Sequence, residues 1–211
     1  DIVSKLKNHE DFRKLFSNFL YEIGYNKGET FWDRFVVRVA PAENNLPYRE
    51  ASRINIHRDT WGTNLYQQIN WWAPVSNVEK KNTMIFYPDY FDVPVKNTTS
   101  TWDLNIYLAN RKKGDFSYPS APQLKEDLPS NIKIVPVTIK PGEILCFSGA
   151  HLHSSSKEKS ENTRISFEIR TICENDLNSS AQAPNVDCDL QWKFPKIFKK
   201  INDNSPLKIT S

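Results

Sequence analysis

Eight short runs of apolar and aromatic residues, separated by Pro, Asn and Gly, dominate the sequence from residue 31 onward. They are rich in Val, Ile, Phe, Tyr and Trp, which favour β-strands, and several of them alternate apolar with polar positions. Many short strands in succession predict a mostly β barrel or sandwich. The runs are Phe31–Val39, Arg53–His57, Tyr66–Val75, Thr83–Tyr87, Trp102–Leu108, Ile132–Ile139, Glu143–Phe147 and Thr163–Ile172.

Helical patterns flank this β-rich part of the chain. Over residues 1–22, apolar residues recur at intervals near three and four with charges between them, and Gly24 follows the last of them. We therefore predict an N-terminal helix there. The basic stretch Trp192–Ile201 is predicted to form a C-terminal helix, and the polar segment 109–131 is predicted to be a long loop.

The length and charge of the chain limit what it can be. With 211 residues it is long enough for one well-buried domain, and no linker divides it, so we predict a single domain over 1–211 with a motif-bearing core at about 31–172. The 28 basic and 25 acidic residues leave a formal charge of only +3. So small an excess predicts neither nucleic-acid nor membrane binding.

The number of cysteines and the hydropathy of the chain indicate the cellular compartment in which we expect the protein. An odd count of three cysteines is typical of a reducing compartment, although a Cys173–Cys188 bridge stays open, and Cys146 is predicted to be a core residue. No apolar run approaches the roughly 20 residues that span a bilayer, and no secretory signal is visible. We expect a soluble, cytoplasmic protein. Because the sequence starts at Asp1 without Met, upstream residues are expected to have been removed.

A polar row follows one of the predicted strands. Side chains alternate between the faces of a strand, so Arg53, Asn55, His57 and Asp59 can all point the same way. The spacing of two lets the imidazole of His57 and the carboxylate of Asp59 reach a common cation. A lone His-x-Asp motif is more often a surface ion pair or a turn than a metal site. Only a third candidate ligand elsewhere in the sequence would favour the metal site.

That ligand is available about ninety residues later. Pro141-Gly142-Glu143 is typical of a turn into a strand, and this strand delivers His151 and His153 at or just beyond its end. Two histidines and one carboxylate, with coordination positions left open, are the donor set of non-haem Fe(II) oxygenases.

The next predicted strand carries a candidate anion site. Its alternation puts Arg164, Ser166, Glu168 and Arg170 on one face. An inward guanidinium is costly to desolvate unless it meets an anion, and its planar fork suits the distal carboxylate of 2-oxoglutarate. Ser166 could add another hydrogen bond to that carboxylate. Arg170 is an alternative anchor for that carboxylate. Otherwise Arg170 is expected to form an ion pair, and Glu168 is the candidate partner.

A third polar row belongs to the strand Tyr66–Val75. Its even-numbered positions share a face, so Gln68, Asn70 and Trp72 can line a cavity. Hydrogen bonds from Gln68 or Asn70 to the cosubstrate are one interpretation, and a merely polar face of the sheet is the other. Arg38 and Arg53 could neutralise an anionic substrate or form structural salt bridges.

Taken in order, these residues resemble the phytanoyl-CoA dioxygenase-like branch of the Fe(II)/2-oxoglutarate-dependent oxygenases. The shared features are His57-x-Asp59, a Gly-(Asp/Glu)-x-x-x-Phe segment starting at Gly142, a following His, and Arg164 eleven residues after His153. This spacing selects His153 over His151 as the distal ligand. The resemblance covers roughly residues 50–172.

The resemblance implies a double-stranded β-helix (a jelly roll or cupin-like barrel) with iron held by His57, Asp59 and His153. Arg164 and Ser166 would hold 2-oxoglutarate, dioxygen would be the second cosubstrate, and a small molecule would be hydroxylated with release of succinate and carbon dioxide. Halogenating members that resemble this branch lack the carboxylate ligand, so Asp59 favours hydroxylation or a related oxidation. Pro88-Asp89-Tyr90 replaces a family motif near the substrate pocket, so the family's substrates are not carried over.

Two other functions compete with this hypothesis. A cupin-like metal-binding or sensor module without turnover could use the same barrel, but it would not need the anchor formed by Arg164 and Ser166. A protein or peptide hydroxylase of the Jumonji type usually anchors the cosubstrate with a lysine on another strand. The sequence predicts neither the primary substrate nor the oligomeric state.

Overall fold

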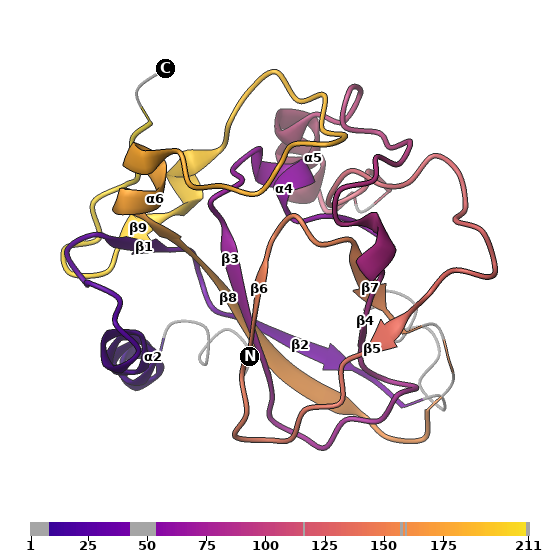
Figure 1. Ribbon diagram of the computed structural model, residues 1–211, viewed down its shortest axis with the longest axis horizontal. Coiled ribbons are helices and arrows are strands. Elements are labelled where there is room, and N and C mark those ends of the chain that lie inside the picture. Colours follow the sequence, from indigo (N-terminus) through magenta and orange to yellow (C-terminus); the bar gives the residue numbers. More distant parts are fainter. Residues whose placement is uncertain (1–8, 43–53, 116, 157, 159, 210–211) are drawn as a thin grey trace.

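The chain is mostly β in the computed structural model, which describes residues 9–42, 54–115, 117–156, 158 and 160–209 (Figure 1). Within these residues, nine strands form two antiparallel sheets, and helices are few. The strands are β1 (Thr30–Trp32), β2 (Val36–Ala40), β3 (Ile69–Pro74), β4 (Met84–Phe86), β5 (Val135–Pro136), β6 (Leu145–Ser148), β7 (His153–Ser155), β8 (Arg164–Cys173) and β9 (Lys199–Lys200). The helices are α2 (Glu10–Glu22), α4 (Thr60–Thr63), α5 (Leu104–Lys112) and α6 (Glu174–Ser179), with 3₁₀ turns η2 (Pro88–Tyr90) and η3 (Pro195–Ile197).

The two sheets bring distant segments of the chain together. The larger sheet has the order β6-β3-β8-β1-β9, and β2 also pairs with β8. The smaller sheet has the order β5-β4-β7. On the free side of β7, His57 pairs with His153, and the Ser155 amide donates to the Ile54 carbonyl at 3.0 Å. Residues 54–57 therefore extend the smaller sheet, beside the larger one (Figure 1).

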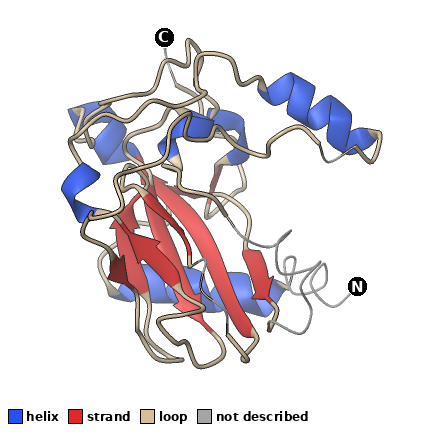
Figure 2. Cartoon of the chain, turned by 90° about the vertical axis from the view of Figure 1, so that its right-hand side faces the viewer, coloured by secondary structure: helices blue, strands red, loops and turns tan. Residues whose placement is uncertain are grey.

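Helix α2 covers one face of the larger sheet, as Figure 2 shows. Its buried side chains Phe16 and Leu20 pack with Trp71 of β3 and Ile169 of β8 in one apolar cluster. Because side chains alternate along a strand, the even-numbered residues of β8 point away from α2, toward the space between the sheets. The N-terminal helix predicted over 1–22 is confirmed over 10–22, and residues 1–8 lie outside the described residues.

Helix α2 exposes some large apolar side chains on its outer face. Leu15 is 66% exposed, and Phe12 is exposed as well.

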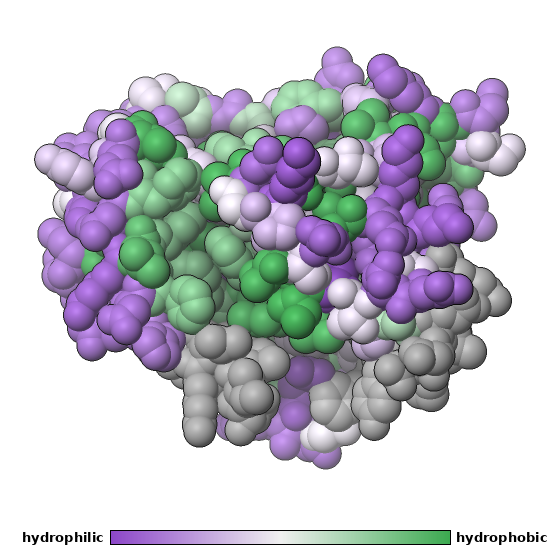
Figure 3. All heavy atoms as spheres, turned by 90° about the horizontal axis from the view of Figure 1, so that it is seen from below, coloured by the Kyte–Doolittle hydropathy of each residue, from purple (hydrophilic) through white to green (hydrophobic). Residues whose placement is uncertain are grey.

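Seen from below, apolar surface runs across the middle of the molecule between polar margins (Figure 3). Among the described residues, no helix is both long and apolar enough to cross a membrane.

One predicted strand is wrong. The run Trp102–Leu108 contributes to helix α5, not to a strand. Asp103 explains the difference, because its carboxylate caps the helix by accepting from the amides of Asn105 at 2.6 Å and Ile106 at 3.2 Å. The helix projects from the body of the protein (Figure 2), and none of its residues is buried.

The predicted C-terminal helix over Trp192–Ile201 is also wrong. Pro195 begins the 3₁₀ turn η3, and the chain then runs extended, so that β9 pairs with β1. Proline lacks the amide that a continuing helix would use, and backbone pairing with an open strand edge satisfies the chain instead.

The cysteines differ from expectation at one position. Cys146 is exposed, not a core residue, because β6 is an edge strand and turns Leu145 and Phe147 toward the interior. Cys173 and Cys188 are both free thiols, so the bridge left open by the sequence is not formed.

Candidate metal centre

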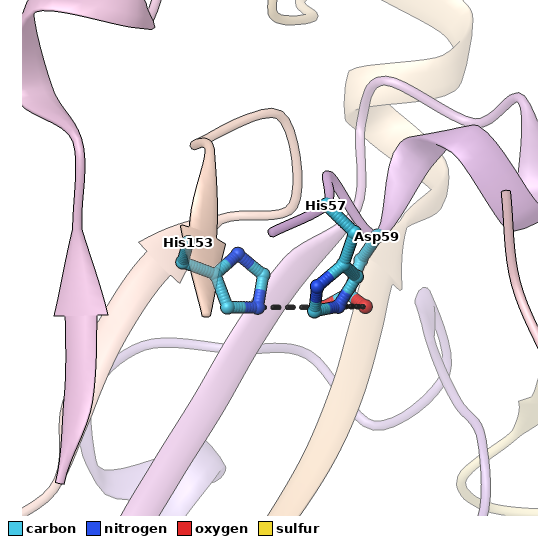
Figure 4. A group of neighbouring side chains, drawn as sticks. All are labelled: His57, Asp59 and His153. Carbon is cyan, nitrogen blue, oxygen red and sulfur yellow. Dashed lines mark ion pairs between the residues drawn. The ribbon is translucent and has the colours of Figure 1, made fainter. Parts of the chain in front are cut away.

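Three side chains converge between the sheets. Backbone hydrogen bonds of 3.0 Å in both directions join His57 to His153, which sets their rings side by side with centroids 4.3 Å apart. Asp59 immediately precedes α4 and directs its carboxylate at both rings (Figure 4). The carboxylate oxygens lie 3.3 Å from His57 Nε2 and 3.9 Å from His153 Nε2.

These separations suit one shared cation. Donor atoms of His57, Asp59 and His153 all lie within 4.8 Å of one another. Ligands at about 2.1 Å from an ion, with a right angle between them, are about 3 Å apart. The structure therefore brings together the three ligands that the sequence predicts, in an arrangement that needs little movement to close on a metal.

Hydrogen bonds fix the orientation of both imidazoles. His57 Nδ1 lies 2.8 Å from the Asn55 carbonyl oxygen, and His153 Nδ1 lies 2.9 Å from the His151 carbonyl oxygen. A carbonyl only accepts, so each Nδ1 carries the proton and donates it. Each Nε2 is left with a free lone pair directed at the centre, which is how metal-bound histidines are usually held.

The protonation states also suit a cation. Burial and the neighbouring His57 lower the pKa of His153 to about 4, so its imidazole is neutral at pH 7. Burial opposes ionisation of Asp59, but its contacts with His57 and His153 and the nearby Arg170 outweigh burial, so the pKa of the carboxyl lies far below its usual range. The Asp59 carboxylate thus supplies a negative charge without having to release a proton.

His151 takes no part in the cluster. Its Nδ1 lies 3.1 Å from the Ser148 carbonyl oxygen, and its ring packs against Phe91 with centroids 4.5 Å apart. The described geometry thus brings His153, not His151, to the other two donors.

Arg164 is a buried cation that forms no ion pair with any described residue, although the charge of Glu168 is near enough to act on it. Its side chain is 3% exposed, and it forms no hydrogen bond or ion pair with any residue that the structure describes. The guanidinium carbon lies 5.6 Å from the centre of the Trp72 ring. Burial and the nearby Arg38 lower the pKa of Arg164 to about 10, against the opposing effect of Glu168, so the guanidinium stays protonated at neutral pH. A buried guanidinium is stable only when an anion compensates for its lost hydration.

The buried Ser166 hydroxyl also lacks a partner among the described residues. Ser166 lies two positions after Arg164 on β8, on the same face of the sheet. Two unsatisfied polar groups, one of them charged, therefore lie side by side in the interior.

The other two arginines of this region are already paired. Arg38 forms an ion pair with Glu168. Arg170 donates from Nε to Asp33 at 2.6 Å, and its backbone amide donates to the other oxygen of Asp33. Asp33, and not Glu168, is thus the counter-ion of Arg170, which leaves Arg164 as the arginine free to receive a new anion.

Gln68 and Asn70 are engaged with the protein. Asn70 donates to the Asp59 carboxylate, and Gln68 donates to Asn70 at 2.9 Å. The sequence predicts that both side chains line the cavity, and it leaves open whether they bond to the cosubstrate or form a polar face of the sheet. In the structure, Asn70 bonds directly to Asp59, and Gln68 bonds to Asn70.

Arg58 is a residue that the sequence analysis did not single out. It lies between the two ligands of the His-x-Asp motif and is 2% exposed. Its guanidinium donates to Asp187 at 3.1 Å and to the carbonyls of Ala150 at 2.6 Å and Tyr90 at 2.7 Å. The position of Arg58 between two candidate ligands is visible in the sequence. Its hydrogen-bond partners could not be predicted, because they come from three distant segments of the chain.

A pocket of about 330 Å³ opens beside the centre. Its walls are residues 36–39 of β2, residues 54–57, and residues 120–123 of the long loop. His57 and Arg38 contribute to the lining, so the pocket reaches the metal centre. The remaining lining is largely aliphatic.

Comparisons by sequence find no relative. No known protein family matches the chain, and no curated protein matches it.

Comparisons of structure do find similar folds. The crystal structure of EvdO2 from Micromonospora carbonacea var. aurantiaca has a TM-score of 0.50 and 10% identity over 92% of this chain and 67% of that one. EvdO2 complexed with 2-oxoglutarate has the same score and identity over 82% and 63%. A non-heme monooxygenase, ThoJ, has a TM-score of 0.46 and 14% identity over 81% of this chain and 54% of that one. At these identities the similarity to EvdO2 concerns the fold alone, and the chain spans little more than half the length of ThoJ.

Proposed function

We propose that this protein is an Fe(II)- and 2-oxoglutarate-dependent oxygenase that hydroxylates a small molecule. The observation that carries the proposal is the convergence of His57, Asp59 and His153 in a protein that also buries Arg164, whose guanidinium has no ion-pair partner among the described residues. The triad fits a ferrous ion with coordination positions left open. The cation fits the far carboxylate of a cosubstrate. A metal site that only stores or senses an ion does not need this second feature.

The strand order supports a double-stranded β-helix. Strands β2, β8, β3 and β6 lie side by side in the larger sheet. Residues 54–57, β7, β4 and β5 do so in the smaller one. Two four-stranded layers of this kind are the jelly-roll arrangement. The fold of EvdO2, which has been crystallised with 2-oxoglutarate, agrees with this interpretation, and the spacing of His153 and Arg164 favours the phytanoyl-CoA dioxygenase-like branch.

Each residue has a defined task in this proposal. His57 and His153 present their Nε2 atoms to the iron, and Asp59 supplies the negative ligand. Arg164 and Ser166 bind the distal carboxylate of 2-oxoglutarate and so orient its keto acid end toward the metal. Bound iron, 2-oxoglutarate and dioxygen together supply the oxidising power, with succinate and carbon dioxide as coproducts. The pocket beside His57, lined by both aliphatic and polar side chains, admits the primary substrate.

Anaerobic reconstitution tests the proposal as a whole. Purified protein with Fe(II) and 2-oxoglutarate is expected to show a weak visible charge-transfer band that neither component produces alone. Exposure to oxygen with a panel of small molecules is expected to release succinate in proportion to the substrate consumed. Absence of the band in folded, iron-loaded protein would contradict the assignment. A band without succinate on any substrate would favour the sensor module.

Arg164→Met tests the cosubstrate anchor. Removing one partner of a buried charge pair costs about 2–5 kcal/mol, which is roughly a 30-fold to several-thousand-fold rise in the Kd for 2-oxoglutarate. Titration calorimetry on the iron-loaded protein without oxygen measures this Kd. Iron affinity is expected to stay near that of the wild type, because Arg164 touches none of the three ligands.

Arg34→Met is the matched control, since Arg34 is exposed. It removes the same charge and leaves the cavity intact. Equal 2-oxoglutarate affinity in Arg164→Met and Arg34→Met would show that another residue anchors the cosubstrate, and Arg170→Met would then be the next variant to test.

A further inference from the structure

A chain of hydrogen bonds leads from α4 to the carboxylate of the metal centre. Thr63 Oγ1 donates to Gln68 Oε1 at 3.2 Å, and Gln68 Nε2 donates to Asn70 Oδ1 at 2.9 Å. Asn70 Nδ2 donates to Asp59 Oδ2. We call Thr63, Gln68 and Asn70 the amide relay. All three of its side chains are buried, and Gln68 is 0% exposed.

The relay has a direction that its members enforce on one another. Asp59 is ionised and only accepts, so it must face the NH₂ group of Asn70. The Asn70 oxygen then requires a donor, which Gln68 provides, and the Gln68 oxygen in turn requires the Thr63 hydroxyl. Rotation of either amide by half a turn would place two acceptors together inside the protein, which is costly in a region of low dielectric.

Gly149 gives the relay its space. A β-carbon at this position would lie 2.6 Å from Gln68 Nε2 and 3.3 Å from Asn70 Oδ1. The first distance is shorter than real contacts of this kind, so any larger residue must displace the Gln68 amide. The backbone amide of Gly149 also donates a hydrogen bond to the backbone carbonyl of Gln68 at 3.0 Å.

We infer that Asn70, oriented by Gln68, is a positioning residue that holds one carboxylate oxygen of Asp59 and leaves the other to the metal. This inference rests on the proposed function and deepens it. Both carboxylate oxygens face the centre, with Oδ1 3.3 Å from His57 Nε2 and Oδ2 3.9 Å from His153 Nε2, and Asn70 donates to Oδ2 alone. Without the relay, the carboxylate can offer both oxygens to the ion.

The number of coordination positions shows why this matters. A bound ferrous ion would be held by His57, Asp59 and His153 and by two donor atoms of 2-oxoglutarate, which would leave a sixth position for dioxygen. A second oxygen from Asp59 would take that sixth position. The relay thus keeps that position open as well as supporting the affinity for the ion.

The test compares relay variants with a matched neighbour. Asn70→Leu removes the donor to Asp59, Gln68→Leu removes the support of Asn70, and Gly149→Ala displaces Gln68 without changing any polar group. Gln67→Leu is the control, because the adjacent Gln67 is outside the relay and bonds Gln182 at the exposed surface. Far-UV and near-UV circular dichroism selects the variants that are folded.

Two measurements without turnover distinguish the outcomes. Losing a partner that orients a ligand typically weakens metal binding about 10–100-fold. We expect this loss of Fe(II) affinity in Asn70→Leu, a smaller loss in Gln68→Leu and Gly149→Ala, and none in Gln67→Leu. Nitric oxide added to the anaerobic iron and 2-oxoglutarate complex probes the sixth position, and its electron paramagnetic resonance signal per bound iron is expected to fall in the same order.

Wild-type values of both quantities in Asn70→Leu, or equal effects of Gln67→Leu and Gln68→Leu, would overturn the inference and leave the proposed function intact. Should Asn70→Leu not fold, Gly149→Ala and Gln68→Leu decide by the same criteria. Failure of the wild-type protein to bind Fe(II) would overturn the relay and the proposed function together.

Discussion

His153→Ala is expected to weaken Fe(II) binding by more than roughly 100-fold, because even the loss of a residue that merely orients a ligand costs about 10–100-fold. The side chain contributes one of three donor atoms, and its Nε2 is already aimed at the centre by the bond from Nδ1 to the His151 carbonyl. Only His57 and Asp59 would then hold the ion. Succinate formation is expected to be lost with the metal.

His151→Ala is the matched control, because His151 lies two residues before His153 in the loop that leads into β7. Its imidazole packs among aromatic rings and does not reach the other two donors, so iron affinity is expected to stay close to the wild-type value. Competition with a coloured chelator under anaerobic conditions measures both affinities. If His151→Ala lost the metal and His153→Ala kept it, the third ligand would be His151, and the loop around Gly149 would have to rearrange.

The sequence predicts the parts of this fold that depend on local patterns. Helix α2 was found from its three- and four-residue periodicity, and most strands from short apolar runs. Where it failed, a single residue outweighed the pattern. Asp103 caps a helix in a run that otherwise suits a strand, and Pro195 stops one in a run that otherwise suits a helix. Both signals are present in the sequence, but they are weaker than the hydrophobic pattern around them.

Some features of the candidate metal centre can be predicted from the sequence, and others cannot. Ligand types and their order can be predicted from the sequence, and the structure does bring the three side chains together. The strand period is not the reason for Asp59, because this residue lies in the turn that precedes α4 and has helical backbone angles. The bonding partners of Asn70 and Arg58 could not be predicted. Asn70 meets Asp59 only after β3 pairs with β8, and Arg58 meets Asp187 from a segment more than a hundred residues away. Such contacts depend on packing between elements, which local periodicity does not specify.

Arg58→Met is expected to lower the free energy of unfolding by about 3–5 kcal/mol, the usual cost of removing one partner of a buried ion pair. Asp187 would be left charged and 4% exposed in its side chain. The carbonyls of Ala150, Tyr90 and Val93 would lose the donors that Arg58 gives them. Because these carbonyls belong to two loops beside the metal centre, the same change is expected to loosen both of them.

Urea unfolding of the metal-free protein measures this free energy, and Lys96→Met is the matched control. Lys96 and Glu126 also form an ion pair, at 2.7 Å, but their side chains are 71% and 62% exposed. Exposed pairs contribute only about 0–1 kcal/mol. A loss in Arg58→Met no larger than that in Lys96→Met would mean that water or a local rearrangement satisfies the buried groups.

The double variant Arg58→Met with Asp187→Leu separates charge from packing. If the cost of Arg58→Met comes from stranding the Asp187 carboxylate, removing that carboxylate as well is expected to restore part of the lost stability. Trp61 and the Val95 amide also donate to Asp187, at 2.7 Å and 3.1 Å, so the recovery will be incomplete. Full additivity of the two single changes would instead show that Arg58 acts through its carbonyl contacts, and that Asp187 is held by Trp61 and Val95 on their own.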